Sequence, residues 1–194
     1  GGVSYTNEGI MGGDVQPANV PLPGFVPWNT GDLASAVATG FAASFGPGIA
    51  VADVDQDGDL DVWAANGADS GTLYTNEAGR FSQATQAWQI DGGSPSISGC
   101  FGDYDNDGFP DLYISCAGPN RLLRNVDGQR FEDVTGPTNT SGGDIFTSQS
   151  VMADLDADGD VDIYCANMAS MTEVAKKNGR WPMDAAPSPN NLFN

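Results

Sequence analysis

The stretch Asp53-Val54-Asp55-Gln56-Asp57-Gly58-Asp59-Leu60-Asp61 decides how the rest of the chain is interpreted. Acidic residues occupy its odd positions, glycine occupies position 6, and the apolar run 62–65 follows directly. The same nine-residue pattern returns at 103–111 and at 154–162, so the three starts lie 50 and 51 residues apart. One such stretch would carry little weight, but three at even spacing indicate an internal repeat.

Two further features occupy the same positions in each repeat. Apolar runs at 49–52, 100–102 and 151–153 precede the three loops, as expected of buried inner strands. A second marker follows each loop: Leu73-Tyr74-Thr75-Asn76, Leu122-Leu123-Arg124-Asn125 and Leu192-Phe193-Asn194. Each repeat therefore predicts four short antiparallel strands with the Asp loop between the first two, which is the size of a propeller blade.

The repeat phase also divides the chain. It predicts an irregular N-terminal segment, or part of a preceding blade, at 1–45, and blades at 46–90, 91–140 and 141–194. The third blade carries an insertion at 168–187, which holds Lys176, Lys177 and Arg180, and it is incomplete at its C-terminal end. About three blades cannot close a ring, since propellers need about four to eight. We expect a fragment of a longer protein; completion of the ring by further copies or by another chain stays open.

Composition excludes several classes of partner. The 194 residues carry a formal net charge of −19, and 14 of the 26 acidic residues lie in the three loops. Crowding of this kind destabilises a fold unless cations neutralise it. Only seven Lys and Arg are present, so nucleic acid is not an expected partner. The chain has no His for a zinc site and no apolar run long enough to span a membrane.

The loop pattern points to Ca²⁺, a hard cation that takes about six to eight oxygen ligands. Carboxylates at positions 1, 3 and 5 curl around one point, glycine at position 6 permits the turn, and position 9 brings a last carboxylate. Mg²⁺ fits less well, because it demands strict octahedral geometry. The predicted side-chain ligands of the three sites are Asp53, Asp55, Asp57 and Asp61; Asp103, Asp105, Asp107 and Asp111; and Asp154, Asp156, Asp158 and Asp162. Position 7 would add the backbone carbonyls of Asp59, Phe109 and Asp160.

These loops are not EF-hands, because position 12 is Ala64, Ile114 or Cys165 rather than Glu and the flanks read as strands. A loop with Asp at position 9 that leads into a strand resembles the FG-GAP/VCBS repeat family, the calcium-binding blades of integrin α-subunit propellers and of many bacterial surface proteins. The resemblance covers residues 46–194 and includes the Leu-Tyr-x-Asn and Gly-Arg-Phe patterns. It implies a seven-bladed propeller with Ca²⁺ between the first two strands of a blade.

Aromatic residues and cysteines fall near the loops. Trp63, Tyr113 and Tyr164 recur at one phase, and we interpret them as packing between blades rather than as a sugar-binding platform. Cys100 and Cys116 flank the second loop, which leaves two readings open: a cross-strand disulfide, or three reduced core cysteines. In either reading Cys165 is expected to be buried and inert.

No catalytic constellation is visible, because the sequence lacks His, a nucleophile elbow and a phosphate-cradling glycine loop. We therefore expect no enzyme but a calcium-stabilised adhesion or scaffold module that binds a protein or glycan partner. Its expected location is secreted, cell-surface or periplasmic, and the insertion at 168–187 is the candidate contact. Two alternatives stay open: a carbohydrate-active propeller (a lectin or polysaccharide lyase), and a structural subunit of a surface or membrane-associated assembly.

Overall fold

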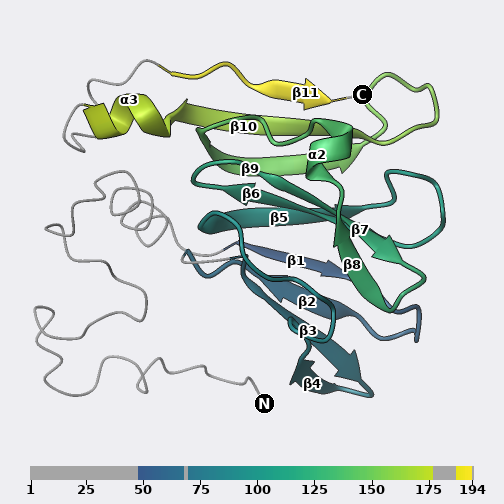
Figure 1. Ribbon diagram of the computed structural model, residues 1–194. Helices are drawn as coiled ribbons and strands as arrows, with labels where there is room; N and C mark the ends of the chain where they lie inside the picture. The colour runs from purple at the N-terminus through teal and green to yellow at the C-terminus, as the bar shows by residue number, and fades with distance from the viewer. Residues whose placement is uncertain (1–47, 68–69, 177–186, 194) are drawn as a thin grey trace, which may run out of the picture.

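The computed structural model describes residues 48–67, 70–176 and 187–193 (Figure 1). The predicted segment 1–45 and residues 177–186 of the predicted insertion lie outside the described residues. The described elements are β1 (Ile49–Ala52), β2 (Asp61–Ala64), β3 (Thr72–Glu77), β4 (Arg80–Gln83), β5 (Ser96–Gly102), β6 (Asp111–Cys116), β7 (Arg121–Val126), β8 (Arg130–Asp133), α2 (Thr135–Thr138), β9 (Ile145–Ala153), β10 (Asp162–Ser170), α3 (Met171–Lys176) and β11 (Asn191–Phe193). Within these ranges, no helix has the length and apolar character needed to cross a membrane.

The described strands form three antiparallel sheets, and each sheet is built from strands that follow one another in sequence. Their orders are β1-β2-β3-β4, β5-β6-β7-β8 and β9-β10-β11. The first two sheets contain the predicted sequence of strand, Asp loop, strand, turn, strand, turn and strand. The all-β class and the internal repeat of antiparallel sheets are therefore confirmed.

The register of the first hairpin is identical in the three sheets. The residue before each Asp loop pairs with the last Asp of that loop, as Ala52 pairs with Asp61 and Gly102 with Asp111. Ala153 pairs with Asp162 in the same way. Equivalent positions of the three repeats can therefore be compared residue by residue, on strands and loops alike.

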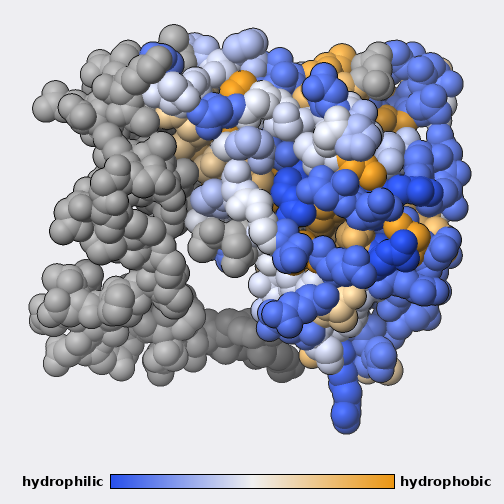
Figure 2. Space-filling view, viewed as in Figure 1, coloured by the Kyte–Doolittle hydropathy of each residue, from blue (hydrophilic) through white to orange (hydrophobic). Residues whose placement is uncertain are grey.

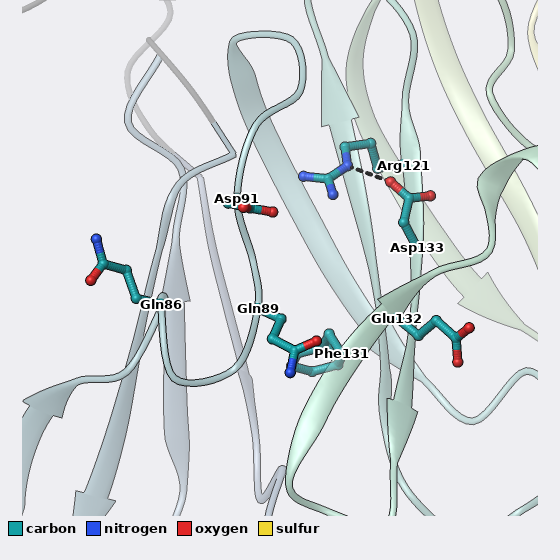
Figure 3. A pocket seen from close by; sticks show the side chains of 7 residues that line it. All are labelled: Gln86, Gln89, Asp91, Arg121, Phe131, Glu132 and Asp133. Carbon is teal, nitrogen blue, oxygen red and sulfur yellow. Dashed lines mark hydrogen bonds and ion pairs between the residues drawn. The ribbon is translucent and has the colours of Figure 1, made fainter.

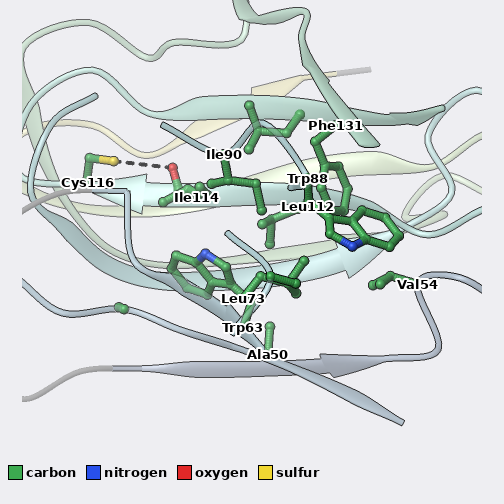
Figure 4. Packing of buried hydrophobic residues seen from close by; sticks show 13 residues of the cluster. Ala50, Val54, Trp63, Leu73, Trp88, Ile90, Leu112, Ile114, Cys116 and Phe131 are labelled. Carbon is green, nitrogen blue, oxygen red and sulfur yellow. Dashed lines mark hydrogen bonds between the residues drawn. The ribbon is translucent and has the colours of Figure 1, made fainter. Parts of the chain in front are cut away.

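The main core lies between the first two sheets. Side chains of the two sheets point toward one another there, with Trp63 and Leu73 on one side and Leu112 and Ile114 on the other (Figure 4). Trp63 fits because its neighbours lack side chains: a Cβ on Gly99 would lie 2.7 Å from the indole ring. A smaller cluster between the second and third sheets joins Tyr113 and Leu122 to Ile163 and Cys165.

The inner strands β1, β5 and β9 lie side by side, with β5 in the middle (Figure 1). The expectation that all three are buried on both faces is wrong for the outer two. In β1 the side chain of Ala50 is buried, whereas those of Ile49 and Val51 are exposed. In β9 the side chain of Val151 is exposed. The physical reason is that only the second sheet has a described neighbour on each face.

The cysteine pairing is also settled by the register. Cys100 lies opposite Tyr113, and Cys116 lies opposite Ser96. The side chain of Cys100 belongs to the cluster facing the third sheet, whereas that of Cys116 faces the first. All three cysteines are free, so the disulfide reading is wrong and the reduced reading is confirmed. Burial raises the pKa of the Cys100 and Cys116 thiols to about 12, so neither is a reactive thiolate.

The described part also contains two short helices that the repeat pattern does not predict. The first, α2, follows β8 directly and covers only four residues. The second, α3, follows β10, which itself continues through Ser170, three residues into the predicted insertion. The third repeat thus departs from the other two by a longer second strand followed by a helix.

Candidate metal centres

The three Asp loops lie at the same end of the three sheets, on the right-hand side of Figure 1. Figure 2, in the same view, shows mostly hydrophilic side chains along that side. The loops are adjacent and in contact, because the Gln56 amide donates a 2.7 Å hydrogen bond to the Gly108 carbonyl of the next loop. Asn106 repeats the link, donating at 2.9 Å to the Asp160 carboxylate of the third loop.

Each loop is closed by its first carboxylate. Asp53 Oδ2 accepts a hydrogen bond from the Gly58 amide at 3.0 Å, and Asp103 and Asp154 do the same for the glycines of their own loops. The glycine amide can point inward because the φ angle of Gly58 is 95°, in a region that residues with a Cβ rarely adopt. The predicted need for glycine at position 6 is therefore confirmed.

Position 4 is a second left-handed position, which sequence reasoning missed. Gln56, Asn106 and Ala157 have φ angles of 58°, 57° and 64°. Asn adopts this region more readily than most residues, but Gln and Ala give no comparable signal. The recurrence of the same angle in three different residues indicates that the loop geometry, rather than the side chain at position 4, sets the backbone there.

The Asp at position 9 anchors each loop to the sheet. The carboxylate of Asp61 is buried and accepts hydrogen bonds from the amides of Val54 and Asn76, both at 2.8 Å. Asp111 accepts equivalent bonds from the amides of Tyr104 and Asn125, at 2.9 and 2.7 Å. In the third loop, buried Asp162 accepts from the Leu155 amide. In the first two loops this carboxylate therefore ties the start of its loop to the third strand of the sheet.

The structure brings three carboxylates together in each loop, with one oxygen from each within 4.8 Å of the others. The groups are Asp53, Asp55 and Asp57; Asp103, Asp105 and Asp111; and Asp154, Asp156 and Asp162. Of the predicted side-chain ligands, Asp61, Asp107 and Asp158 lie outside their groups. Loop one thus gathers positions 1, 3 and 5, whereas loops two and three gather positions 1, 3 and 9.

The side chains at position 7 are turned away from the loop centres. Asp59 accepts a hydrogen bond from the Ala78 amide in the β3–β4 turn, and Asp160 accepts from Asn106 of the neighbouring loop. Phe109 lies against the β7–β8 turn, where a Cβ on Gly128 would come within 3.0 Å of its ring. This explains how an apolar residue is tolerated at position 7 of an acidic loop.

The electrostatics of the loops fit a bound cation. Asp53 Oδ1 and Asp105 Oδ1 are buried and receive no hydrogen bond from the described residues. Burial, together with the neighbouring Asp105 and Asp107 carboxylates, raises the pKa of Asp111 to about 7. The pKa of Asp61 is also raised, mainly by burial. A donor set made only of oxygens, with unsatisfied negative charge, is what Ca²⁺ requires.

Sequence reasoning also missed a cation that the protein itself supplies. Arg124, on β7, places its Nε 2.6 Å from Asp105 Oδ2 and its Nη2 2.9 Å from Asp107 Oδ2. These two carboxylates belong to the predicted ligand set of loop two. The equivalent position in the first repeat is Thr75, which carries no charge. The signal was present in the second marker, which reads Leu-Tyr-Thr-Asn in one repeat and Leu-Leu-Arg-Asn in the next.

A separate hollow of about 570 Å³ lies between the β4–β5 connection and strands β7 and β8 of the second sheet (Figure 3). Its lining residues are Gln86, Gln89, Asp91, Arg121, Phe131, Glu132 and Asp133. Arg121 pairs with Asp133 at 2.9 Å and also donates to the Gly92 carbonyl. Burial alone would raise the pKa of Asp133, but hydrogen bonds from Thr135 and Arg121 lower it below its ordinary value. Arg121 and Asp133 are thus engaged with one another.

Comparison with known proteins agrees with the repeat. The family model described as an FG-GAP-like repeat matches residues 53–114 and again residues 103–165. Each match begins at the first Asp of a loop and continues into the strand that follows the next loop, and together they cover more than half of the chain. No curated protein matches the chain. On the strength of its repeats, the chain belongs to the FG-GAP-like repeat family.

Proposed function

We propose that this protein is a calcium-stabilised, non-enzymatic interaction module of the β-propeller type. The observation that carries the proposal is the threefold recurrence of one loop geometry with a buried carboxylate at position 9. In loops one and two, an unsatisfied carboxylate oxygen also lies in the loop. Ca²⁺ binding to the loops would relieve this charge. Because a ligand that binds only the folded state stabilises it, each occupied loop would hold its hairpin in place.

We also propose that the sheets are blades of a propeller. Three sheets with adjacent inner strands, together with membership of the FG-GAP-like family, support a ring of blades in which each loop connects the first two strands of a blade. We propose that the ring presents its surfaces to a protein or glycan partner as an adhesion or scaffold element. The family's usual extracellular setting supports a location outside the cytoplasm, on the cell surface or in the periplasm.

Thermal unfolding with and without Ca²⁺ tests the metal assignment. We expect EDTA to lower the melting temperature and millimolar Ca²⁺ to restore it, whereas Mg²⁺ at the same concentration restores it only in part. An identical melting temperature in EDTA and Ca²⁺ would refute the assignment.

Matched single variants assign the effect to individual loops. Asp55→Asn, Asp105→Asn and Asp156→Asn each change position 3 of one loop, and each is expected to remove one Ca²⁺ equivalent in a calorimetric titration. Asp127→Asn is the control, because Asp127 is an exposed acid in the β7–β8 turn, outside all three loops. Loss of binding in the control, or full stoichiometry in the three loop variants, would contradict these ligands.

A glycan array and a capture experiment address the partner class. Binding to defined oligosaccharides would favour a lectin over a protein-binding scaffold. The Ca²⁺-loaded protein is the sample to use, since bound Ca²⁺ is expected to stabilise the loops. Turnover of any bound polysaccharide would contradict the non-enzymatic assignment.

A further inference from the structure

Loops one and two are joined by a buried chain of hydrogen bonds that begins at a carboxylate of loop two. The Asn125 backbone amide donates to Asp111 Oδ1 at 2.7 Å, and the Asn125 side-chain amide donates to the Val54 carbonyl at 2.8 Å. The Val54 amide in turn donates to Asp61 Oδ2 at 2.8 Å. All four residues are fully buried, where hydrogen bonds are electrostatically stronger than in water. Position 9 of loop two is thus connected to position 9 of loop one.

This chain of bonds passes through the part of loop one that gathers carboxylates. Val54 lies between Asp53 and Asp55, two of the three residues whose carboxylates come together in loop one. Asp111 belongs to the corresponding group of loop two. Asn125 therefore fixes the backbone between two predicted ligands of one site, while it is itself held by a predicted ligand of the other site.

Two further contacts join the same segments. Asn125 Oδ1 accepts a hydrogen bond from the Gly128 amide at 3.0 Å, which fixes the β7–β8 turn. A Cβ on Gly128 would lie 3.2 Å from Asp55 Cα, so this turn packs on the backbone of a predicted ligand. On the exposed side, Gln56 donates to the Gly108 carbonyl of loop two at 2.7 Å. The second repeat therefore contacts loop one at positions 2, 3 and 4.

We propose that Asn125 is a positioning residue that couples the Ca²⁺ sites of loops one and two, so that each site binds its cation more tightly when the other is occupied. The inference rests on the proposed function, because it requires Ca²⁺ in both loops. Ordering a set of ligands costs conformational entropy, and this cost is smaller for a second cation when the first has already ordered a shared element. The shared element is Asn125 with the bonds that it makes to both loops.

The sign of the coupling distinguishes a linked pair of sites from two independent ones. Two cations at neighbouring sites repel one another, so sites that sense only each other's charge bind the second cation more weakly. A shared, ordered element acts in the opposite direction. Coupling between binding sites is also reciprocal, so each cation must raise the affinity for the other by the same factor. We expect this coupling factor to be at least about fivefold.

Calorimetric titration with Ca²⁺ measures the coupling factor in the whole chain. The parent for all samples carries Asp156→Asn, which disables loop three and leaves two sites. Adding Asp105→Asn leaves loop one as the binding site, and adding Asp55→Asn instead leaves loop two. The product of the two stepwise affinities of the parent, divided by the product of the two single-loop affinities, gives the coupling factor.

The link is then cut without a change of charge. Asn125→Ala removes the buried chain of bonds, and Gln56→Ala removes the exposed contact. Each is measured in the parent and in both single-loop chains, so the effect of losing one carboxylate charge is common to all comparisons and cancels. The coupling factor is expected to fall toward one in Asn125→Ala and to fall in part in Gln56→Ala.

Asn106→Ala is the matched control for Gln56→Ala. Both residues occupy position 4 of their loops with similar positive φ angles, and Ala157 shows that alanine is accommodated there. The side chain of Asn106, however, donates to Asp160 of loop three and not to loop one. The control is therefore expected to leave the coupling between loops one and two unchanged.

Amide hydrogen exchange provides a readout that a purely structural role of Asn125 would not change. In the chain that binds Ca²⁺ only at loop two, the cation is expected to slow exchange of the Val54 amide in loop one. Adding Asn125→Ala is expected to abolish this response. Circular dichroism confirms that each variant is folded, and Gln56→Ala carries the comparison if Asn125→Ala is not.

The outcomes separate this inference from the proposed function. Binding at both loops with a coupling factor of one or below would overturn the inference and leave the proposed function intact. So would coupling that survives unchanged in both Asn125→Ala and Gln56→Ala, because the described contacts would then not transmit it. Absence of Ca²⁺ binding at loops one and two would overturn both.

Discussion

The first and second Asp loops share a backbone conformation and a hydrogen-bond pattern, yet they differ in what surrounds them. Loop two contacts Arg124, and its buried carboxylate Asp111 is connected through Asn125 to Val54 of loop one. Loop one has Thr75 and Asn76 at the equivalent positions. The comparison teaches that the nine-residue pattern defines the shape of a loop, whereas neighbouring strands determine its charge balance and its role in packing.

The two marker asparagines offer the largest contrast. Asn125 is fully buried; it donates to the carbonyls of Val54 and Pro110 and accepts from the Gly128 amide. Asn76 donates to the Leu60 carbonyl alone, and its Oδ1 has no partner among the described residues. Leaving a buried polar group without a partner costs about 1–3 kcal/mol.

We therefore expect Asn125→Ala to lower the free energy of unfolding by about 3 kcal/mol, and Asn76→Ala by about 1 kcal/mol. Urea unfolding in excess Ca²⁺ measures both values under one condition. Equal losses in the two variants would indicate that the hydrogen bond from Asn125 to Val54 of loop one contributes nothing.

The second contrast between the two loops is how their buried carboxylates make the stability of the metal-free protein depend on pH. The raised pKa of Asp111, about 7, means that the folded state holds this proton more tightly than the unfolded chain does. The contribution of Asp111 to the free energy of unfolding is fully present below about pH 4, which is the pKa of Asp in the unfolded chain. This contribution is lost as the pH rises through about 7, the pKa of Asp111 in the folded state. In EDTA, the melting temperature is therefore expected to fall over this interval. Bound Ca²⁺ favours the ionised carboxylate and reverses the slope.

Melting curves of Asp111→Asn and Asp61→Asn across this pH range separate the two loops. Asp111→Asn is expected to flatten the EDTA profile more than Asp61→Asn does, since only Asp111 has a pKa displaced as far as neutrality. A profile that rises with pH in EDTA would contradict the assignment of Asp111 as a buried, uncompensated acid.

The smallest contrast concerns metal affinity. Arg124 is partly exposed and neutralises part of the charge of Asp105 and Asp107, so Ca²⁺ must compete with it. A partly exposed ion pair contributes up to about 1 kcal/mol, which corresponds to roughly fivefold in affinity. Arg124→Thr is expected to tighten Ca²⁺ binding at loop two by about this factor.

The reciprocal change, Thr75→Arg, is expected to weaken binding at loop one. Calorimetric titration of both variants against the wild type gives the two shifts. If neither variant changes the affinity of any site, the ion pair of Arg124 does not compete with the metal.

The sequence predicted those parts of the fold that depend on local geometry. Gly58 and its equivalents and the strands on either side of each loop follow from patterns within one repeat. The predicted packing role holds for Trp63 and Tyr113, which are buried, but not for Tyr164, which is exposed in the described part of the chain. What it could not predict depends on the register and on neighbouring sheets. The Cys100–Cys116 pairing failed because the pairing of Gly102 with Asp111 places Cys100 opposite Tyr113.

The grouping of the loop carboxylates also depends on their surroundings. The pattern gives every loop the same four carboxylates, whereas the group of three that lie together includes Asp57 in the first loop and Asp111 in the second. Arg124 could not be placed, because its contact with Asp105 requires the third strand to lie beside the loop. Such relations join segments that lie apart in the sequence of one repeat and meet only when its strands pair.

The packing of Trp63 against Gly99 has a consequence for how the chain folds while it is being synthesised. Every strand of the first sheet pairs with a sequence neighbour, so that sheet can form as soon as its own residues are available. The indole, however, gains its cover only after β5 and β6 have been synthesised. A ribosome-bound chain therefore passes through a stage in which a complete hairpin sheet exposes a tryptophan, and during this stage it is vulnerable to misassociation.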